Sequence, residues 1–289
     1  MPPEPCAPAV DPSKTSRALG LDGTAFARAA DLVRSECGIK LSEAKSNLIV
    51  SRLGRRVKTL NFHDFHAYLD FVEGKGGQKE RRKMTSLLTT NVTRFFREPH
   101  HFDSLREDVL PALVAKAKRG GAVRIWSAGC SSGEEPLSIG MEILKLCPDA
   151  PDMDMRILGT DLDPVSLQTA RNATYGKTAL EKVPGDLRAR YFEPVGDGQN
   201  LCASARLRAL ATYAELNLME PWPMQRSFDV IFCRNVMIYF DNATQAMLWP
   251  RFAEALMPGG MLFIGHSERL HGPGAQRFKP SGITQYRRN

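Results

Sequence analysis

The stretch FDVIFCRNVMIYF, residues 228–240, decides how the C-terminal two thirds of this chain folds. Its first half is apolar and rich in strand-forming residues, which is typical of a strand covered on both faces of a parallel sheet. Arg234 and Asn235 then interrupt the apolar run, which resumes at Val236. Because an unpaired guanidinium is costly to bury, we expect these two polar side chains to meet solvent, a protein partner or a ligand.

Strand and helix patterns alternate from residue 122 onward, which predicts a parallel α/β sheet. Besides the strand in the quoted stretch, strands are predicted at 123–129, 155–163 and 261–266, and one at the sheet edge at 283–288. Helices are predicted to follow the strands at 130–146 (after a polar turn), 164–172 and 242–257. Ligands bind beyond the carboxyl ends of the strands in such sheets, so Arg234 and Asn235 are expected at a ligand site.

Two further features are expected at the same edge. The first predicted strand leads into the turn Gly129–Gly133, whose small residues allow the backbone to approach a ligand closely. The turn is not G-x-G-x-x-G, so it indicates a dinucleotide only weakly. The second strand ends in Asp161, which is placed to accept hydrogen bonds from ribose hydroxyls. The pair favours a nucleoside cofactor, although many α/β proteins carry such turns for packing alone.

The N-terminal region is predicted to be helical and carries the positive charge of the chain. The formal net charge is +7, and 15 basic and eight acidic side chains lie between Lys14 and Lys83. Helices are predicted at 23–38, 42–61 and 62–74. On the second helix Lys45, Arg52, Arg55 and Arg56 share one arc beside the apolar face. This basic arc is either a solvated face or a docking surface for an acidic partner.

Composition excludes several other classes of protein. Residues 1–20 include a proline-rich stretch without an apolar signal-peptide core, and we expect them to form a disordered tail. No apolar run approaches the roughly 20 residues of a membrane helix. The six cysteines form no C-x-x-C pair, which indicates reduced thiols in a cytosol. The histidines at 63, 66, 100 and 101 have no cysteine or carboxylate at a recognisable ligand spacing, so no metal is assigned.

The segment TTNVTRFFREPHHF, residues 89–102, joins the helical and α/β regions. In it Asn91, Thr93 and Arg97 alternate with Phe95 and Phe96, a density of aromatic and polar groups that a plain linker does not need. The segment is therefore either an aromatic plug with a surface arginine or a part of the ligand site.

Several motifs occur together in this chain: the segment 89–102, WSAGCSSGEEPLSIGM at 126–141, GTDLDP at 159–164, NL at 217–218, FDVIFCRNVMIYF at 228–240 and GHSE at 265–268. Together they resemble those of a known family, the CheR-type chemotaxis receptor methyltransferases. The resemblance runs in order from about Phe26 to Arg287, nearly the whole chain. The resemblance implies an α/β fold: an N-terminal all-helical domain at 21–88 and a Rossmann-like methyltransferase domain at 89–289, with a small antiparallel insert at about 184–214.

The resemblance also implies an activity, a site and partners. Such enzymes transfer a methyl group from S-adenosylmethionine to glutamate side chains of chemoreceptors and release S-adenosylhomocysteine. Carried over by motif, the cofactor site comprises Asn91, Thr93, Arg97, Glu135, Asp161, Asn217, Leu218, Arg234 and Asn235. Arg97 and Tyr239 are expected nearest the transferred methyl group, as the catalytic residues, and the basic arc is expected to dock the receptor.

The expected partners are the cytoplasmic helices of methyl-accepting chemotaxis receptors, with no nucleic acid and no membrane insertion. The resemblance implies a bacterial, cytoplasmic protein, expected to be a monomer and recruited to receptor arrays. The chemistry needs no general base, since a glutamate carboxylate with an ordinary pKa of about 4.3 is already ionised at neutral pH. Catalysis is expected to come from alignment and exclusion of water.

Two alternatives stay open. The first is a nucleic-acid methyltransferase, although the strand that ends in Cys-Arg-Asn-Val lacks the Asn/Asp-Pro-Pro-aromatic turn of amino-methylating enzymes. The second is a non-catalytic adaptor that senses S-adenosylmethionine, which the retention of both Arg97 and Tyr239 disfavours.

Overall fold

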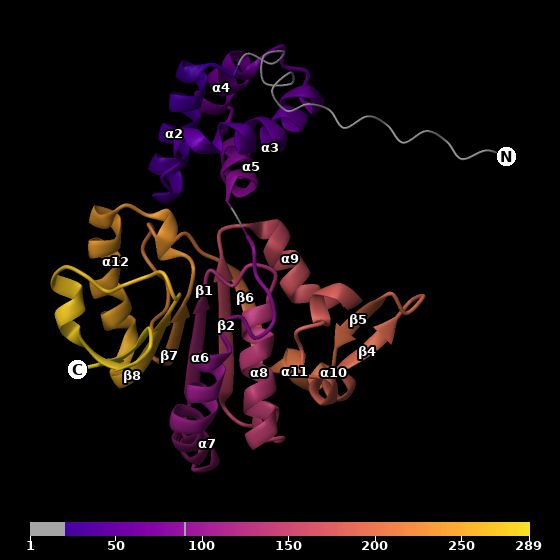
Figure 1. Ribbon diagram of the computed structural model, residues 1–289, viewed down its shortest axis with the longest axis vertical. Coiled ribbons are helices and arrows are strands. Elements are labelled where there is room, and N and C mark those ends of the chain that lie inside the picture. Colours follow the sequence, from indigo (N-terminus) through magenta and orange to yellow (C-terminus); the bar gives the residue numbers. More distant parts are fainter. Residues whose placement is uncertain (1–20, 90) are drawn as a thin grey trace. The chain divides into compact units, whose positions relative to one another are not determined.

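The computed structural model describes residues 21–89 and 91–289, and the chain divides into two units, Met1–Thr90 and Asn91–Asn289 (Figure 1). The predicted tail at 1–20 lies outside the described residues. In those described ranges, no helix combines the length and apolar character needed to cross a membrane. The five cysteines of the same ranges are free thiols, in agreement with the prediction for this part of the chain.

Unit 1 is all-helical, as predicted. Its helices are α2 (Gly23–Cys37), α3 (Ser46–Thr59), α4 (Phe65–Glu73) and α5 (Gln78–Leu88), with a short 3-10 turn at Glu43–Lys45. Asp22 caps α2 by accepting a hydrogen bond from the Ala25 N–H at 2.8 Å, and Gly38 ends the helix in the left-handed region with φ 75°. The sequence pattern did not predict α5, whose charged sequence QKERRKMTSLL buries few apolar side chains, notably Met84 and Leu88.

Unit 2 contains a seven-stranded sheet in the order β6-β2-β1-β7-β8-β10-β9. The first five strands in this order are parallel, and β10 pairs antiparallel with both β8 and β9. The strands are β1 (Val123–Ala128), β2 (Met155–Asp161), β6 (Ala211–Glu215), β7 (Phe228–Cys233), β8 (Leu256–Ile264), β9 (Phe278–Gly282) and β10 (Gln285–Arg288). The predicted strands are all present, but β8 starts at Leu256 instead of Met261, and β6 and β9 were not predicted.

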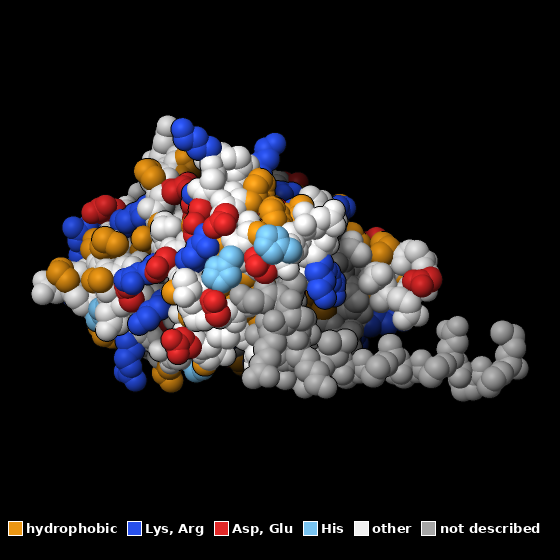
Figure 2. Space-filling view, turned by 90° about the horizontal axis from the view of Figure 1, so that it is seen from above, with side chains coloured by type: hydrophobic (Ala, Val, Ile, Leu, Met, Phe, Trp, Pro, Cys, Tyr) orange, Lys and Arg blue, Asp and Glu red, His pale blue; other side chains and the backbone are white. Residues whose placement is uncertain are grey.

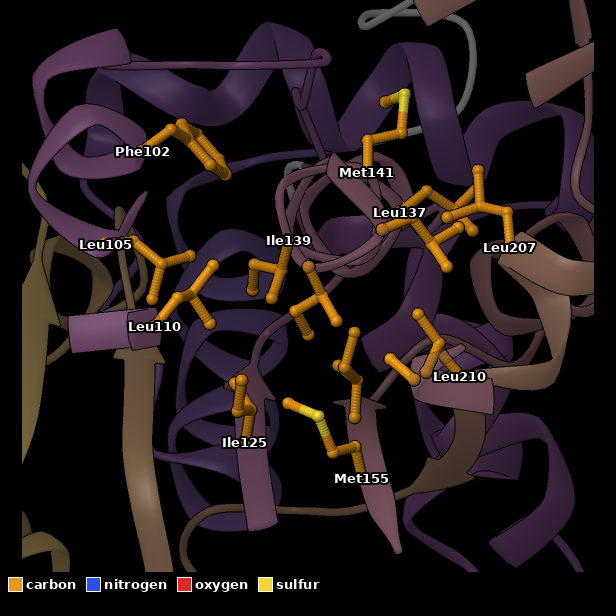
Figure 3. Close-up of a cluster of buried hydrophobic side chains, with 14 of the residues drawn as sticks. Phe102, Leu105, Leu110, Ile125, Leu137, Ile139, Met141, Met155, Leu207 and Leu210 are labelled. Carbon is orange, nitrogen blue, oxygen red and sulfur yellow. The ribbon is translucent and has the colours of Figure 1, made fainter. Parts of the chain in front are cut away.

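Helices cover both faces of this sheet (Figure 1). One face carries α6 (Pro99–Ser104), a π-helical turn (Leu105–Val109), α7 (Leu110–Lys118) and α8 (Glu134–Leu146). Figure 3 shows Ile125 of β1 and Met155 of β2 in one buried cluster with Leu137 and Ile139 of α8. The next residue of β1, Trp126, points to the opposite face and contacts Phe252 of α12 (Asn242–Ala255), with ring centroids 5.5 Å apart.

A second, antiparallel sheet in the order β3-β5-β4 forms the insert. It comprises β3 (Thr174–Gly176), β4 (Phe192–Val195) and β5 (Asn200–Ala203), reached from β2 through α9 (Pro164–Asn172) and accompanied by α10 (Gly185–Tyr191) and α11 (Ala205–Ala209). The insert therefore begins about ten residues before the expected 184, and the segment at 211–215 is a strand of the large sheet.

Candidate cofactor site at the carboxyl ends of the strands

The turn after β1 is shaped by close packing. Gly129 has φ 78°, and a Cβ atom there would lie 2.3 Å from Cγ2 of Val236, in the segment after β7. At Gly133, with φ 93°, a Cβ atom would lie 2.8 Å from the Ala170 Cβ of α9. The Gly129 N–H donates to the Thr160 carbonyl of β2 at 2.8 Å. Glycine is thus required at both positions, because φ is positive and the neighbouring atoms of α9 and of the segment after β7 leave no room for a Cβ atom.

Asp161 ends β2 and faces this turn. Its Oδ2 accepts the Ser131 N–H at 2.8 Å and its Oδ1 accepts the Asp163 N–H at 2.9 Å. Burial raises the pKa of Asp161, while these backbone hydrogen bonds act in the opposite direction. A carboxylate offers about four acceptor positions, so Asp161 retains capacity for the two hydroxyls of a ribose. The residue fits the cofactor role predicted for it.

The first residues of the linker contact the turns that follow β1 and β2. Asn91 donates from Nδ2 to Asp163 Oδ2 and to Ser166 Oγ, each at 3.0 Å, and its carbonyl accepts the Ser131 hydroxyl at 3.2 Å. Thr93 follows two residues later and is half-buried. The structure therefore brings Asn91 next to the strand ends that carry Asp161, and Thr93 lies two residues further along the same segment.

The middle of the linker satisfies both interpretations of its sequence. Phe95 is fully buried and contacts the insert edge-on, 5.1 Å from the Tyr175 ring and 5.6 Å from the Phe192 ring. Arg97 stays at the strand ends, where its carbonyl accepts a hydrogen bond from Arg234 Nη2. The aromatic side chain anchors the linker. On either side of it, the Asn91 side chain and the Arg97 carbonyl form hydrogen bonds with residues at the strand ends.

Arg234, the residue that interrupts the opening stretch, is buried and paired by the protein itself. Its side chain is 2% exposed, with Nη1 3.1 Å from Glu135 Oε2 and Nη2 3.5 Å from Glu98 Oε2. Ser127 Oγ donates to the other oxygen of Glu135 at 2.7 Å. Burial raises the pKa of Glu135, while the charge of Arg234 and the Ser127 hydrogen bond oppose that shift. The guanidinium, which was expected to meet solvent, a partner or a ligand, is therefore paired with two carboxylates of its own chain.

Asn235 and Tyr239 follow on a turn organised by a buried glutamate. Glu268 is 4% exposed and accepts the backbone N–H groups of Asn235 at 3.0 Å, Ile238 at 3.2 Å and Gly265. Burial raises the pKa of Glu268, although the backbone hydrogen bonds oppose the shift. Tyr239 lies half-buried in the short 3-10 turn Met237–Tyr239 that this carboxylate supports. Glu268 was noted in the sequence only as the last residue of GHSE.

Glu98 was missed as a site residue. Its Oε1 accepts the His266 N–H at 3.2 Å, lies 2.8 Å from His266 Nδ1 and is 3.4 Å from Asn235 Nδ2. Burial acts to raise the pKa of Glu98, but the His266 hydrogen bond and the Arg234 charge outweigh it and bring the pKa to about 2. Asn235 and His266 are more than 130 positions away from Glu98 in the chain, so no local pattern could reveal these contacts.

Left-handed backbone conformations concentrate at this edge. Among the described non-glycine residues with positive φ are Phe96 (50°), Glu98 (56°), Ser131 (49°) and Asn235 (59°). Each such residue costs on the order of 1–3 kcal/mol and persists where surrounding contacts enforce it, often at functional sites.

Asn217 and Leu218 reach the edge because β6 is a strand of the large sheet. The Leu216 N–H donates to the Asp161 carbonyl at 3.0 Å, which aligns the end of β6 with the end of β2. Asn217 Oδ1 accepts the Met219 N–H at 3.0 Å, and Leu218 is buried. The structure thus brings the predicted cofactor residues of the large domain to one edge of one sheet.

Some cations of the basic arc already bind acidic or backbone groups within unit 1. Arg56 forms a pair with the buried Glu80 of α5 at 2.6 Å, and Arg52 donates to backbone carbonyls at the C-terminal end of α5. Arg55 is exposed, and Lys45 ends the 3-10 turn before α3. On the face drawn in Figure 2, basic and acidic side chains intermingle. Receptor docking by the arc remains a prediction, for which Arg55 is the best placed residue.

One group of side chains within residues 21–89 and 91–289 has the spacing of metal ligands. Ligand atoms of Glu98, His100 and His101 lie within 4.8 Å of one another. Glu98 Oε2 also lies 3.5 Å from Arg234 Nη2, and this positive charge disfavours a divalent ion at the same oxygen. We assign no metal here, and a metal-free enzyme stays a prediction.

Comparisons with known proteins agree with this geometry. Residues 24–89 match the family described as CheR methyltransferase, all-alpha domain, and residues 91–287 match CheR methyltransferase, SAM binding domain. The chain is 47% identical over 258 residues to a probable chemotaxis protein methyltransferase of Rhizobium etli, which covers 89% of this chain and 96% of the relative. A chemotaxis protein methyltransferase of Escherichia coli is 36% identical over 272 residues, or 93% and 92% of the two chains. The chain therefore belongs to the CheR family of S-adenosylmethionine-dependent chemotaxis methyltransferases.

Proposed function

We propose that this enzyme methylates glutamate side chains on the cytoplasmic helices of chemoreceptors, forming glutamate methyl esters for sensory adaptation. The observation that carries the proposal is the anchoring of the linker at both ends. Asn91 is bonded to the residues that follow β2, and the Arg97 carbonyl is bonded to Arg234 at the end of β7. The Arg97 guanidinium donates to the Val92 carbonyl of the same linker at 2.8 Å. The anchored backbone therefore supports the proposal that Arg97 works beside the cofactor edge, where a substrate carboxylate would arrive.

Each residue of the site has a separate role in the proposed methyl transfer. When bound, S-adenosylmethionine supplies a methyl group on a positively charged sulfur. Asp161 accepts hydrogen bonds from the ribose, beside the turn Gly129–Gly133, whose glycines are required by packing against Val236 and Ala170. Arg97 orients the incoming carboxylate through its forked donors. Tyr239 donates a hydrogen bond close to the reacting groups, and no base is needed because the carboxylate is already ionised.

Single-turnover methylation of a receptor cytoplasmic fragment tests these roles. We expect Tyr239→Phe to slow transfer while cofactor affinity stays near that of the wild type, because only a hydrogen bond is removed. We expect Arg97→Ala to slow transfer more severely, since the substrate carboxylate loses its orienting group. Tyr286→Phe on β10, a half-buried tyrosine outside the site, is the matched control and should react like the wild type.

Three outcomes would contradict the proposal. Wild-type rates in both variants would show that the reacting centre is misplaced. Methylation of nucleic acid in place of the receptor would favour the first alternative. Tight cofactor binding without transfer to any receptor fragment would favour a sensing adaptor.

A further inference from the structure

His266 combines an exposed ring with a buried anchor. Its side chain is 67% exposed, whereas the side chain of Glu98 is 10% exposed. Nδ1 of His266 lies 2.8 Å from Glu98 Oε1, and the His266 N–H donates to the same oxygen at 3.2 Å. The contacts with Glu98 offset the rotamer entropy that is lost when a surface side chain is fixed, so they favour one orientation of the exposed ring.

The anchored ring belongs to the cofactor edge. Glu98 Oε1 is also 3.4 Å from Asn235 Nδ2, and the chain neighbour of Glu98 is Arg97. A Cβ atom on Gly265, the residue before His266, would lie 2.8 Å from the Asn235 backbone nitrogen. His266 is therefore held close to Asn235 and to the segment that carries Arg97.

We propose that His266 contacts the carboxylate side chain of the substrate and that Glu98 is its positioning residue. The inference rests on the proposed function, because a glutamate side chain supplies the anionic group. Nδ1 is directed at Glu98, so Nε2 is the ring nitrogen left for a ligand. In the protonated ring both nitrogens are donors, one to Glu98 and one to a carboxylate oxygen. Arg97 and His266 would then hold the substrate carboxylate from two sides.

The test is a comparison of receptor KM with cofactor affinity. His266→Ala should raise the receptor KM about tenfold or more, because a hydrogen bond to a charged group is lost. The Kd for S-adenosylhomocysteine should change by no more than about twofold, since the ring is not assigned to the cofactor. His266→Gln keeps an N–H donor and should recover part of the KM. His271→Ala is the control, because that ring is bonded to Gln245 and not to Glu98.

A double-mutant cycle separates positioning from a general structural effect. Glu98→Gln should also raise the receptor KM, and the double variant with His266→Ala should be close to the worse single variant. Residues that act through one another are non-additive, whereas independent effects multiply. Glu142→Gln, a buried carboxylate paired with Lys145 on α8, controls for the loss of a buried charge.

Each outcome decides the inference. A wild-type enzyme that methylates glutamate, together with His266→Ala at unchanged KM and rate, would overturn the role of His266 and leave the proposed function intact. A tenfold loss of cofactor affinity in His266→Ala would also overturn it, by showing that the ring supports the cofactor site. A wild-type enzyme that methylates no receptor would remove the proposed function and this inference together.

Discussion

Replacing Arg234 by methionine should destabilise unit 2 far more than the loss of an ordinary surface charge. Methionine fills similar space but leaves the carboxylate of Glu135, 14% exposed, and that of Glu98, 10% exposed, without their cation. Removing one partner of a buried ion pair costs roughly 3–5 kcal/mol, because the remaining charge stays desolvated. We expect Arg234→Met to lower the free energy of unfolding by about this amount at neutral pH.

The pH dependence of this loss follows from Glu135. Burial already raises the pKa of Glu135 against the pull of Arg234, and without Arg234 that pKa rises further. A carboxyl group whose pKa is higher in the folded than in the unfolded state weakens folding as the pH rises through that interval. The destabilisation by Arg234→Met should therefore grow as the pH rises above the ordinary range of a glutamate carboxyl. Adding Glu135→Gln to Arg234→Met should recover part of the lost free energy of unfolding.

Urea unfolding followed by circular dichroism measures both effects. Arg277→Met is the control, because Arg277 and Glu254 form an ion pair in which the side chains are 49% and 64% exposed. Exposed pairs contribute about 0–1 kcal/mol, so this variant should unfold almost like the wild type. Equal, small losses in Arg234→Met and Arg277→Met would refute the claim that a buried charge pair organises the site.

Three other predictions concern acid stability, the cofactor and the receptor. Burial and the Arg234 charge lower the pKa of His101 to about 3, so below about pH 6.5 the unfolded chain takes up a proton that the folded chain refuses. Between pH 7 and pH 5, the free energy of unfolding of the wild type should thus fall by roughly 2 kcal/mol more than that of His101→Gln in urea titrations, and equal changes in the two proteins would contradict the prediction. Asp161→Ala should weaken calorimetric binding of S-adenosylhomocysteine by about 1.5–3 kcal/mol for each ribose hydrogen bond lost, and unchanged binding would rule out the ribose role. Arg55→Glu should raise the receptor KM severalfold at low salt and less at high salt, because exposed charges are screened within roughly 10 Å at 0.1 M; a KM insensitive to the change would return the arc to a solvated face.

The sequence predicted the parallel sheet and the site edge because both depend on local patterns. Apolar runs mark β1, β2 and β7, and the polar residues that end them, such as Asp161 and Arg234, necessarily fall at one edge of a parallel sheet. The linker was harder to interpret. Its aromatic residues suggested either packing or function, and the structure shows that Phe95 packs while Asn91 and Arg97 reach the strand ends.

Features that depend on distant partners could not be predicted in this way. Glu98 gains its importance from His266 and Arg234, far along the chain, and its left-handed backbone leaves no mark in the residue type. Arg56 was predicted as one of the four cations of the basic arc, but Glu80 of α5 forms an ion pair with it. The helix α5 was not predicted because its sequence has no clear apolar pattern. Most of β6 was assigned to the insert because the resemblance implied an insert that extends to about residue 214, whereas the strand pairs in parallel with β2 of the large sheet.

The central claim, methylation of receptor glutamates, is tested most directly by locating the transferred methyl group. A receptor cytoplasmic fragment would be incubated with this enzyme and isotopically labelled S-adenosylmethionine, then digested and analysed by mass spectrometry. The account predicts label on glutamate side chains as a base-labile ester, lost when those glutamates are replaced by glutamine. Label found only in base-stable linkage on another residue type, or absent from the receptor fragment altogether, would contradict it.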